Sequence, residues 1–130
     1  MPLKGIRVID LGQMLAVPFL TRRMGDLGAE IIKAEMPGTG DVTRGLAGPK
    51  IKDTCSYFIG LNRNKKSITL NLRHPLAREV ICKLAEVSDV VVENFRAKTV
   101  DKWGVGYDAL KKVNPKIIYC SISGFGQEGP

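Results

Sequence analysis

The sequence predicts an α/β fold in which helices cover both faces of a parallel sheet. Residues 90–92 form a run of three valines without polar alternation, which is typical of a strand with two buried faces. Strand-like and helix-like segments alternate along the rest of the chain. The valine run ends abruptly at Glu93, Asn94 and Arg96. Because ligands of open α/β sheets bind beyond the carboxyl ends of strands, we expect a binding site here.

The first third of the chain predicts a strand, a helix and a second strand. Residues 5–11 have the apolar pattern of a buried strand, and residues 12–16 form a loop. Pro18 suits the first turn of a helix, where its missing N–H is not needed, and helical spacing continues to about Gly28. Residues 30–35 form the second strand, which predicts a parallel crossover.

The middle of the chain predicts loops followed by a strand and a helix. Residues 36–44 form a loop, residues 45–53 show no clear period, and residues 57–59 are a short apolar run. Residues 67–72 alternate like a half-buried strand, and Pro75 begins a helix that leads to the valine strand. We expect an apolar stripe on this helix made of Leu76, Val80, Ile81, Leu84 and Val87.

The last third predicts two short helices and a final strand. Thr99 is placed to cap a short helix through Trp103, and residues 107–113 form another helix. Residues 116–122 form the last strand, and residues 123–130 form a loop at the carboxyl edge of the sheet.

Composition indicates one domain of an ordinary globular protein. The chain has 130 residues, 44% of them hydrophobic, and no apolar run is long enough to span a membrane. The N-terminus lacks the hydrophobic core of a signal peptide, so we expect a cytoplasmic protein without membrane association. The three cysteines are odd in number and lack metal-ligand spacing, which favours buried free thiols in a reducing compartment.

The net charge of +7 favours an anionic partner. Only residues 62–66 cluster basic side chains, and no stripe of basic and aromatic residues exists. We therefore expect no nucleic-acid partner, although charge alone leaves that alternative open. The turn after the first strand lacks G-x-G-x-x-G, so Glu35 at the end of the second strand is weak evidence for a dinucleotide. His74 is the sole histidine, which gives no support to a metal site or a catalytic triad.

Six segments occur in an order that resembles the N-terminal part of the family III CoA-transferases. This group contains carnitine and formyl-CoA transferases and α-methylacyl-CoA racemase. The segments are GIRVIDL (5–11), DLGAEIIKAEMPG (26–38), GDVTR (40–44), NRNKKS (62–67), VENFR (92–96) and SGFGQ (123–127). The resemblance implies a Rossmann-like large domain, of which residues 1–130 would be an incomplete N-terminal, CoA-binding part. It also implies a homodimer for the full-length protein.

The same resemblance implies that coenzyme A is the ligand, without a metal. Arginine and lysine would pair with its phosphates, asparagine would offer a donor and an acceptor, and apolar side chains would contact the adenine. Met36 stands where many members have an arginine that holds a CoA phosphate, so one phosphate contact is missing there. The candidate CoA-binding residues are Met14, Leu15, Ala16, Met36, Leu70, Arg73, Asn94, Phe95, Lys102 and Trp103.

The function implied is transfer of CoA between an acyl-CoA and a free carboxylic acid. Family members use an aspartate that forms a mixed anhydride and then an aspartyl-CoA thioester. That aspartate follows the glycine-rich loop of residues 124–127 in the family and would lie beyond Pro130. We therefore assign no catalytic residue and expect the chain alone to be inactive. An α-methylacyl-CoA racemase and a non-catalytic CoA-binding module are the alternatives.

Overall fold

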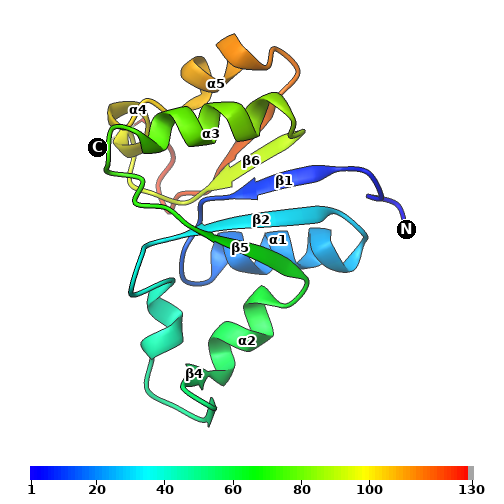
Figure 1. Cartoon of the computed structure of the whole chain (residues 1–130), viewed down its shortest axis with the longest axis vertical. Helices are drawn as coiled ribbons and strands as arrows, with labels where there is room; N and C mark the ends of the chain where they lie inside the picture. Colours follow the sequence, from blue (N-terminus) through cyan, green and yellow to red (C-terminus); the bar gives the residue numbers. More distant parts are fainter. Residues whose placement is uncertain (129–130) are drawn as a thin grey trace.

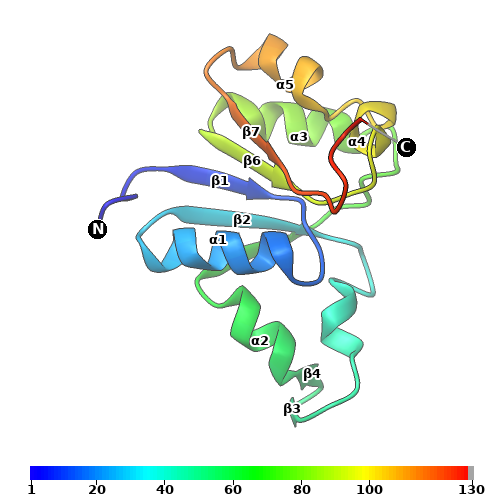
Figure 2. The ribbon, with the colours of Figure 1, turned by 180° about the vertical axis from the view of Figure 1, so that it is seen from behind.

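The computed structural model describes residues 1–128, which form a five-stranded parallel sheet with helices on both faces (Figures 1 and 2). The strand order is β5-β2-β1-β6-β7, so the predicted α/β class is confirmed. The elements are β1 (Arg7–Asp10), α1 (Ala16–Asp26), β2 (Glu30–Glu35), the 3-10 helix η1 (Val42–Gly45), β3 (Lys50–Ile51), β4 (Thr54–Cys55), α2 (Ser56–Asn62), β5 (Lys65–Thr69), α3 (Ala77–Glu86), β6 (Val90–Glu93), α4 (Thr99–Lys102), α5 (Tyr107–Val113) and β7 (Ile118–Ser121).

Strand β1 is the middle strand and pairs in parallel with β2 on one side and β6 on the other. Ile9 lies opposite Ile32 in β2 and Val91 in β6. All four pairings in the sheet are parallel, which brings the carboxyl ends of the strands to one edge. We call this edge the carboxyl rim.

Two apolar layers explain why the valine run lacks polar alternation. Val8, Val90 and Val92 pack with Val17 of α1 on one face of the sheet. On the other face, Ile9 and Val91 join a cluster with residues of α3, α4 and α5, such as Ile81, Val100 and Leu110. Figure 1 shows α3, α4 and α5 on one side of the sheet and α1 on the other. The strands are therefore buried on both faces, as the sequence predicts.

The apolar stripe expected on α3 is wrong in part. Its buried residues are Ala77, Ile81 and Ala85, whereas Leu76 and Val87 are 60% and 59% exposed. The buried residues recur every fourth position, and the small side chains of Ala77 and Ala85 on either side of Ile81 allow the helix to lie close to the sheet. A prediction that weighs only the size and hydrophobicity of side chains therefore places the buried stripe on the neighbouring face of the helix.

The segment between β2 and β5 contains structure that the sequence pattern did not predict. A short hairpin of β3 and β4 precedes α2, and η1 follows the loop after β2. Figure 2 shows this segment extending away from the sheet below α1. Strand β5 begins at Lys65, two positions before the expected start. Within residues 1–128, no helix combines the length and apolar character needed to cross a bilayer.

Candidate functional site

A cavity of about 270 Å³ lies at the carboxyl rim, on the face of the sheet that α3 and α4 cover. We call it the rim cavity. Phe95 and Trp103 meet edge to face within its lining, with ring centroids 5.0 Å apart. Its wall therefore combines aromatic, apolar and guanidinium groups. The lining residues are Gln13, Ala34, Met36, Leu70, Leu72, Arg73, Phe95, Arg96, Thr99 and Trp103.

The rim cavity brings together five of the ten candidate residues from the sequence. These are Met36, Leu70, Arg73, Phe95 and Trp103, which come from the ends of β2, β5, β6 and α4. They are far apart in the sequence, and the parallel sheet places them side by side. Their contact with CoA stays a prediction.

The other five candidates lie around the cavity instead of in its wall. Lys102 lines an adjacent hollow of about 450 Å³ that also contains Arg73 and Trp103. Asn94 lines a third hollow, next to the loop of residues 124–128. Met14 and Leu15 are 45% and 51% exposed and precede α1, and the exposed Ala16 is its first residue. The structure thus leaves Met14, Leu15 and Ala16 outside the rim cavity.

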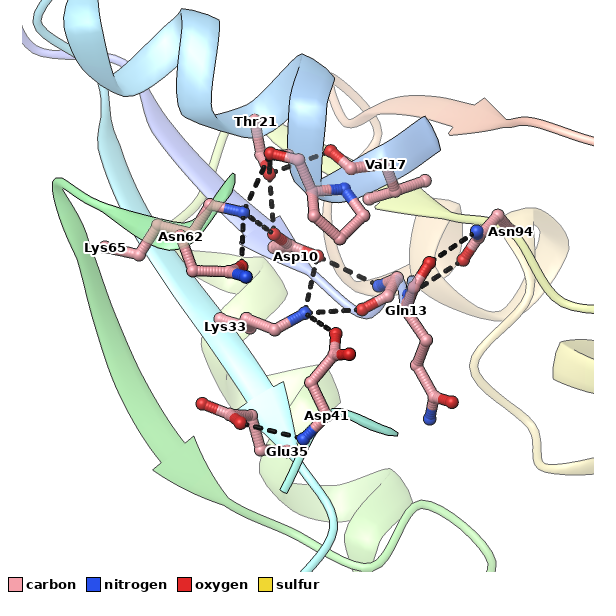
Figure 3. A network of polar contacts seen from close by, with 12 residues as sticks. Asp10, Gln13, Val17, Thr21, Lys33, Glu35, Asp41, Asn62, Lys65 and Asn94 are labelled. Atoms are coloured by element: carbon pink, nitrogen blue, oxygen red, sulfur yellow. Dashed lines mark hydrogen bonds and ion pairs between the residues drawn. The ribbon is translucent and has the colours of Figure 1, made fainter. Parts of the chain in front are cut away.

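Asn94 fixes the loop that follows β1. Its Oδ1 accepts a hydrogen bond from Gln13 N, and its Nδ2 donates to Gln13 O, both at 2.9 Å. Figure 3 shows this reciprocal pair. Gln13 lines the rim cavity, and Met14 next to it has a left-handed backbone with φ +67°. Both polar ends of the Asn94 side chain are therefore used to position the cavity wall.

A buried ionic network holds the same loop from the opposite face of the sheet (Figure 3). Lys33, only 1% exposed, donates from Nζ to the carbonyl of Gly12 at 2.6 Å and lies 3.0 Å from Asp41 Oδ2. Asp10 Oδ1 accepts from Gly12 N at 2.9 Å, and Asp10 Oδ2 is 2.9 Å from Lys65 Nζ. Both backbone groups of Gly12 are thus bonded to buried charged side chains. We call these residues the Lys33 network.

The comparisons with known proteins agree with this architecture. Residues 3–130 match the model of CoA-transferase family III. The chain belongs to CoA-transferase family III. It is 47% identical to succinyl-CoA:glutarate CoA-transferase of Mus musculus over 129 residues, which cover 99% of this chain and 30% of the mouse protein.

Two further relatives complete the comparison. The succinyl-CoA–L-malate CoA-transferase beta subunit of Chloroflexus aurantiacus is 43% identical over 130 residues, which cover 100% of this chain and 32% of that protein. A crystal structure of a CAIB/BAIF family protein from Brucella suis superimposes with a TM-score of 0.92 at 42% identity. That alignment covers 100% of this chain and 35% of the other. The chain thus spans about a third of the length of its relatives.

In this family III chain, Arg96 is a cavity residue that the sequence reasoning omitted. It lines the rim cavity and the hollow next to residues 124–128. Its position directly after Asn94 and Phe95, at the end of the valine strand, was the available signal. Among residues 1–128, neither Arg73 nor Arg96 forms an ion pair with a carboxylate, so both guanidinium groups are available to a ligand.

The Lys33 network was also missed, although a lysine inside an apolar strand is itself a signal of buried pairing. Burial would raise the pKa of Asp41, but the charge of Lys33 and hydrogen bonds from Thr43 outweigh it and lower that pKa below its usual value. Burial lowers the pKa of Lys65, and the neighbouring Asp10 opposes this effect. The network therefore consists of charges stabilised by one another.

Glu35 joins the end of β2 to η1. Burial alone would raise its pKa, but hydrogen bonds from Arg44, Ser67 and the backbone N–H of Asp41 lower it from 4.5 to about 2. Arg44 binds both carboxylate oxygens, at 2.7 and 2.8 Å. Glu35 is therefore an ionised structural anchor, and the ribose-binding role considered for it is not available to a carboxylate so fully engaged.

Chemically, the rim cavity can bind but contains no acid or base of its own. No aspartate or glutamate of residues 1–128 lines it. Aromatic and apolar side chains suit a flat base, and arginines suit phosphate oxygens. Within the same residues, no group of three or more His, Cys, Asp or Glu side chains is placed to hold a metal ion.

Proposed function

We propose that this chain is the CoA-binding N-terminal part of an enzyme that transfers CoA between an acyl-CoA and a free carboxylic acid. The observation that carries the proposal is the convergence of Leu70, Arg73, Phe95 and Trp103 in one cavity at the carboxyl rim of a family III chain. A parallel α/β sheet binds ligands at this edge. The interpretation of residues 1–130 as one part of a large domain belongs to the same proposal.

Each wall of the rim cavity has a role in this proposal. Leu70 and Trp103 would contact the adenine, and Arg73 would pair with phosphate oxygens, as would the adjacent Lys102. Asn94 would act through Gln13, because its own amide is engaged with the backbone there. Met36 supplies apolar surface where an arginine is common in the family, so we expect phosphate binding to depend on Arg73, Arg96 and Lys102.

The relatives favour a transferase over the alternative of an α-methylacyl-CoA racemase. The mouse and Chloroflexus proteins named above transfer CoA between succinyl-CoA and glutarate or L-malate. Both acceptors are carboxylic acids, so the same class of acceptor is proposed here. A homodimeric full-length enzyme is part of the proposal.

The chemical step would use an aspartate that is not part of the rim cavity. In this route, an aspartate carboxylate attacks the thioester carbonyl, and the CoA thiolate leaves as a mixed anhydride forms. The thiolate then attacks the aspartyl carbonyl, which gives aspartyl-CoA and releases the acid. The acceptor carboxylate reverses these steps. Because no carboxylate of residues 1–128 lines the cavity, we propose that the 130-residue chain binds CoA without catalysing exchange.

Calorimetric titration of the purified chain with CoA tests the binding proposal. We expect saturable binding that Arg73→Ala and Lys102→Ala each weaken by roughly tenfold, the size of one charge-assisted contact. Lys83→Ala is the control, because Lys83 is exposed in the last turn of α3, away from the rim cavity. Equal affinities in all four proteins would refute the site. Exchange of CoA between an acyl-CoA and a free acid by the purified chain would refute the proposal that the nucleophilic aspartate is not part of this chain.

A further inference from the structure

The hollow beside the rim cavity contains a third cation that has no role in the site described so far. Arg73, Arg78 and Lys102 line it together, in a volume of about 450 Å³. They come from three different segments: the loop after β5, the first turn of α3, and α4. Arg73 and Trp103 also line the rim cavity, so the two spaces share a wall. We call this space the cationic hollow.

The backbone at Gly104 accommodates the Arg78 side chain. Gly104 has φ +71°, and a Cβ atom there would lie 2.9 Å from Cδ and 3.2 Å from Nε of Arg78. A residue with a side chain would therefore displace the arginine and would be strained in this left-handed conformation. With glycine, the arginine packs across the turn that follows Lys102 and Trp103.

Among the described residues, the cations that line the cationic hollow outnumber its acidic side chains three to one. Within residues 1–128, Arg73, Arg78 and Lys102 form no ion pair. Asp101 is the one acidic residue in the lining. Its Oδ1 is directed at the backbone of Gly106, where a Cβ atom would lie only 1.9 Å from it. Three unpaired cations therefore converge on a space next to the proposed adenine position.

We propose that the cationic hollow binds a phosphate monoester on the nucleotide end of the ligand, and that Arg78 distinguishes CoA from dephospho-CoA. The inference rests on the proposed function, because the adenine in the rim cavity would place the neighbouring ribose 3′-phosphate at the hollow. A phosphate monoester carries a charge of about −1.5 to −2 at neutral pH, which is more than one cation can balance. Arginine suits this role because its planar guanidinium binds two phosphate oxygens at once.

The test compares the dissociation constants of CoA and dephospho-CoA for the wild-type chain, Arg78→Gln and Lys83→Gln. We expect the wild type to prefer CoA by roughly tenfold or more, the size of a charge-assisted contact. Arg78→Gln should remove most of this preference, because it should weaken the binding of CoA and leave the binding of dephospho-CoA unchanged. Lys83→Gln alters the net charge equally, on the same helix but outside the hollow, and should keep the preference. Thermal melts would show that both variants are folded.

The possible results separate this inference from the function on which it rests. A wild-type chain that binds the two ligands equally would overturn the inference and leave CoA binding intact. Arg78→Gln weakening both ligands equally, or neither, would also overturn it. Failure of the wild type to bind either ligand would overturn the proposed function together with the inference.

Discussion

The ammonium group of Lys33 donates to the carbonyl oxygen of Gly12 at a distance of 2.6 Å, inside the protein and almost without solvent contact. Gly12 opens the loop that forms one wall of the rim cavity through Gln13. The lysine belongs to the face of the sheet that α1 covers, whereas the cavity lies on the opposite face. The Lys33 network on one face of the sheet and the rim cavity on the other are therefore connected through the backbone of the loop that begins at Gly12.

Lys33→Met is expected to destabilise the chain by about 3–5 kcal/mol, because it removes one partner of a buried ion pair and leaves Asp41 unpaired. Urea unfolding measures the change, with Lys83→Met as the exposed control. Adding Asp41→Asn to Lys33→Met should cost less than the sum of the two single changes. Additive costs would show that the two residues are not energetically coupled.

The free energy of unfolding should fall in acid, because Glu35 loses its stabilising contacts when it is protonated. Hydrogen bonds lower the pKa of Glu35 to about 2 in the folded chain, against 4.5 for an unperturbed glutamate, so its stabilising effect is complete above pH 4.5 and lost as the pH falls toward 2. Because Arg44 is partly exposed, we expect about 1–2 kcal/mol after solvent screening. The unfolding free energies of wild type and Glu35→Gln in urea should differ most at pH 6, and the difference should shrink steadily as the pH falls below 4.5 toward 2. A constant difference would exclude this origin.

Asn94→Ala should loosen the loop after β1 and weaken the binding of CoA. Loss of its two hydrogen bonds to Gln13 is expected to cost about 1–3 kcal/mol and to speed hydrogen exchange at the Gln13 amide. Asn114→Ala is a comparable control, because the Asn114 side chain also bonds to backbone groups: it donates to Ala85 and Ser88 and accepts from Lys116. We expect it to lower stability similarly without changing exchange at Gln13. Equal effects of both variants on CoA affinity would contradict a positioning role for Asn94.

Trp103 is the sole tryptophan, so its fluorescence reports directly on the rim cavity. Addition of CoA should change the fluorescence emission of Trp103. Trp103→Ala should weaken the binding of CoA by roughly tenfold, as expected for loss of base stacking worth about 1–3 kcal/mol. Tyr57→Ala removes an exposed aromatic ring on α2, outside the lining of the rim cavity, and should leave the affinity for CoA unchanged. An unchanged emission at saturating CoA would place the adenine elsewhere.

The sequence predicted the sheet well because its signals are local. Three consecutive valines and the spacing around Pro18 and Pro75 each reflect burial or a helix start within a few residues. The α3 stripe failed because the choice between Ala77 and Leu76 depends on how close the helix approaches the sheet. The hairpin of β3 and β4 has only two residues in each strand, too short for a periodic signal.

The candidate site was predictable only in part, for a different reason. Leu70, Arg73, Phe95 and Trp103 come from motifs, and the parallel topology alone brings them to one rim. The pairing of Lys33 with Asp41 and the packing of Arg78 on Gly104 depend on side-chain geometry between separate segments. No local pattern encodes such partners, so they became visible only in three dimensions.

The reciprocal contact between Gln13 and Asn94 joins residues 81 positions apart. Closure of so long a segment is entropically costly and slow relative to local helix formation. During synthesis on a ribosome, the early strands would emerge long before Asn94 is available to them. A nascent chain therefore has no complete rim cavity until β6 leaves the exit tunnel, and the CoA binding proposed above would stabilise the protein only after that moment.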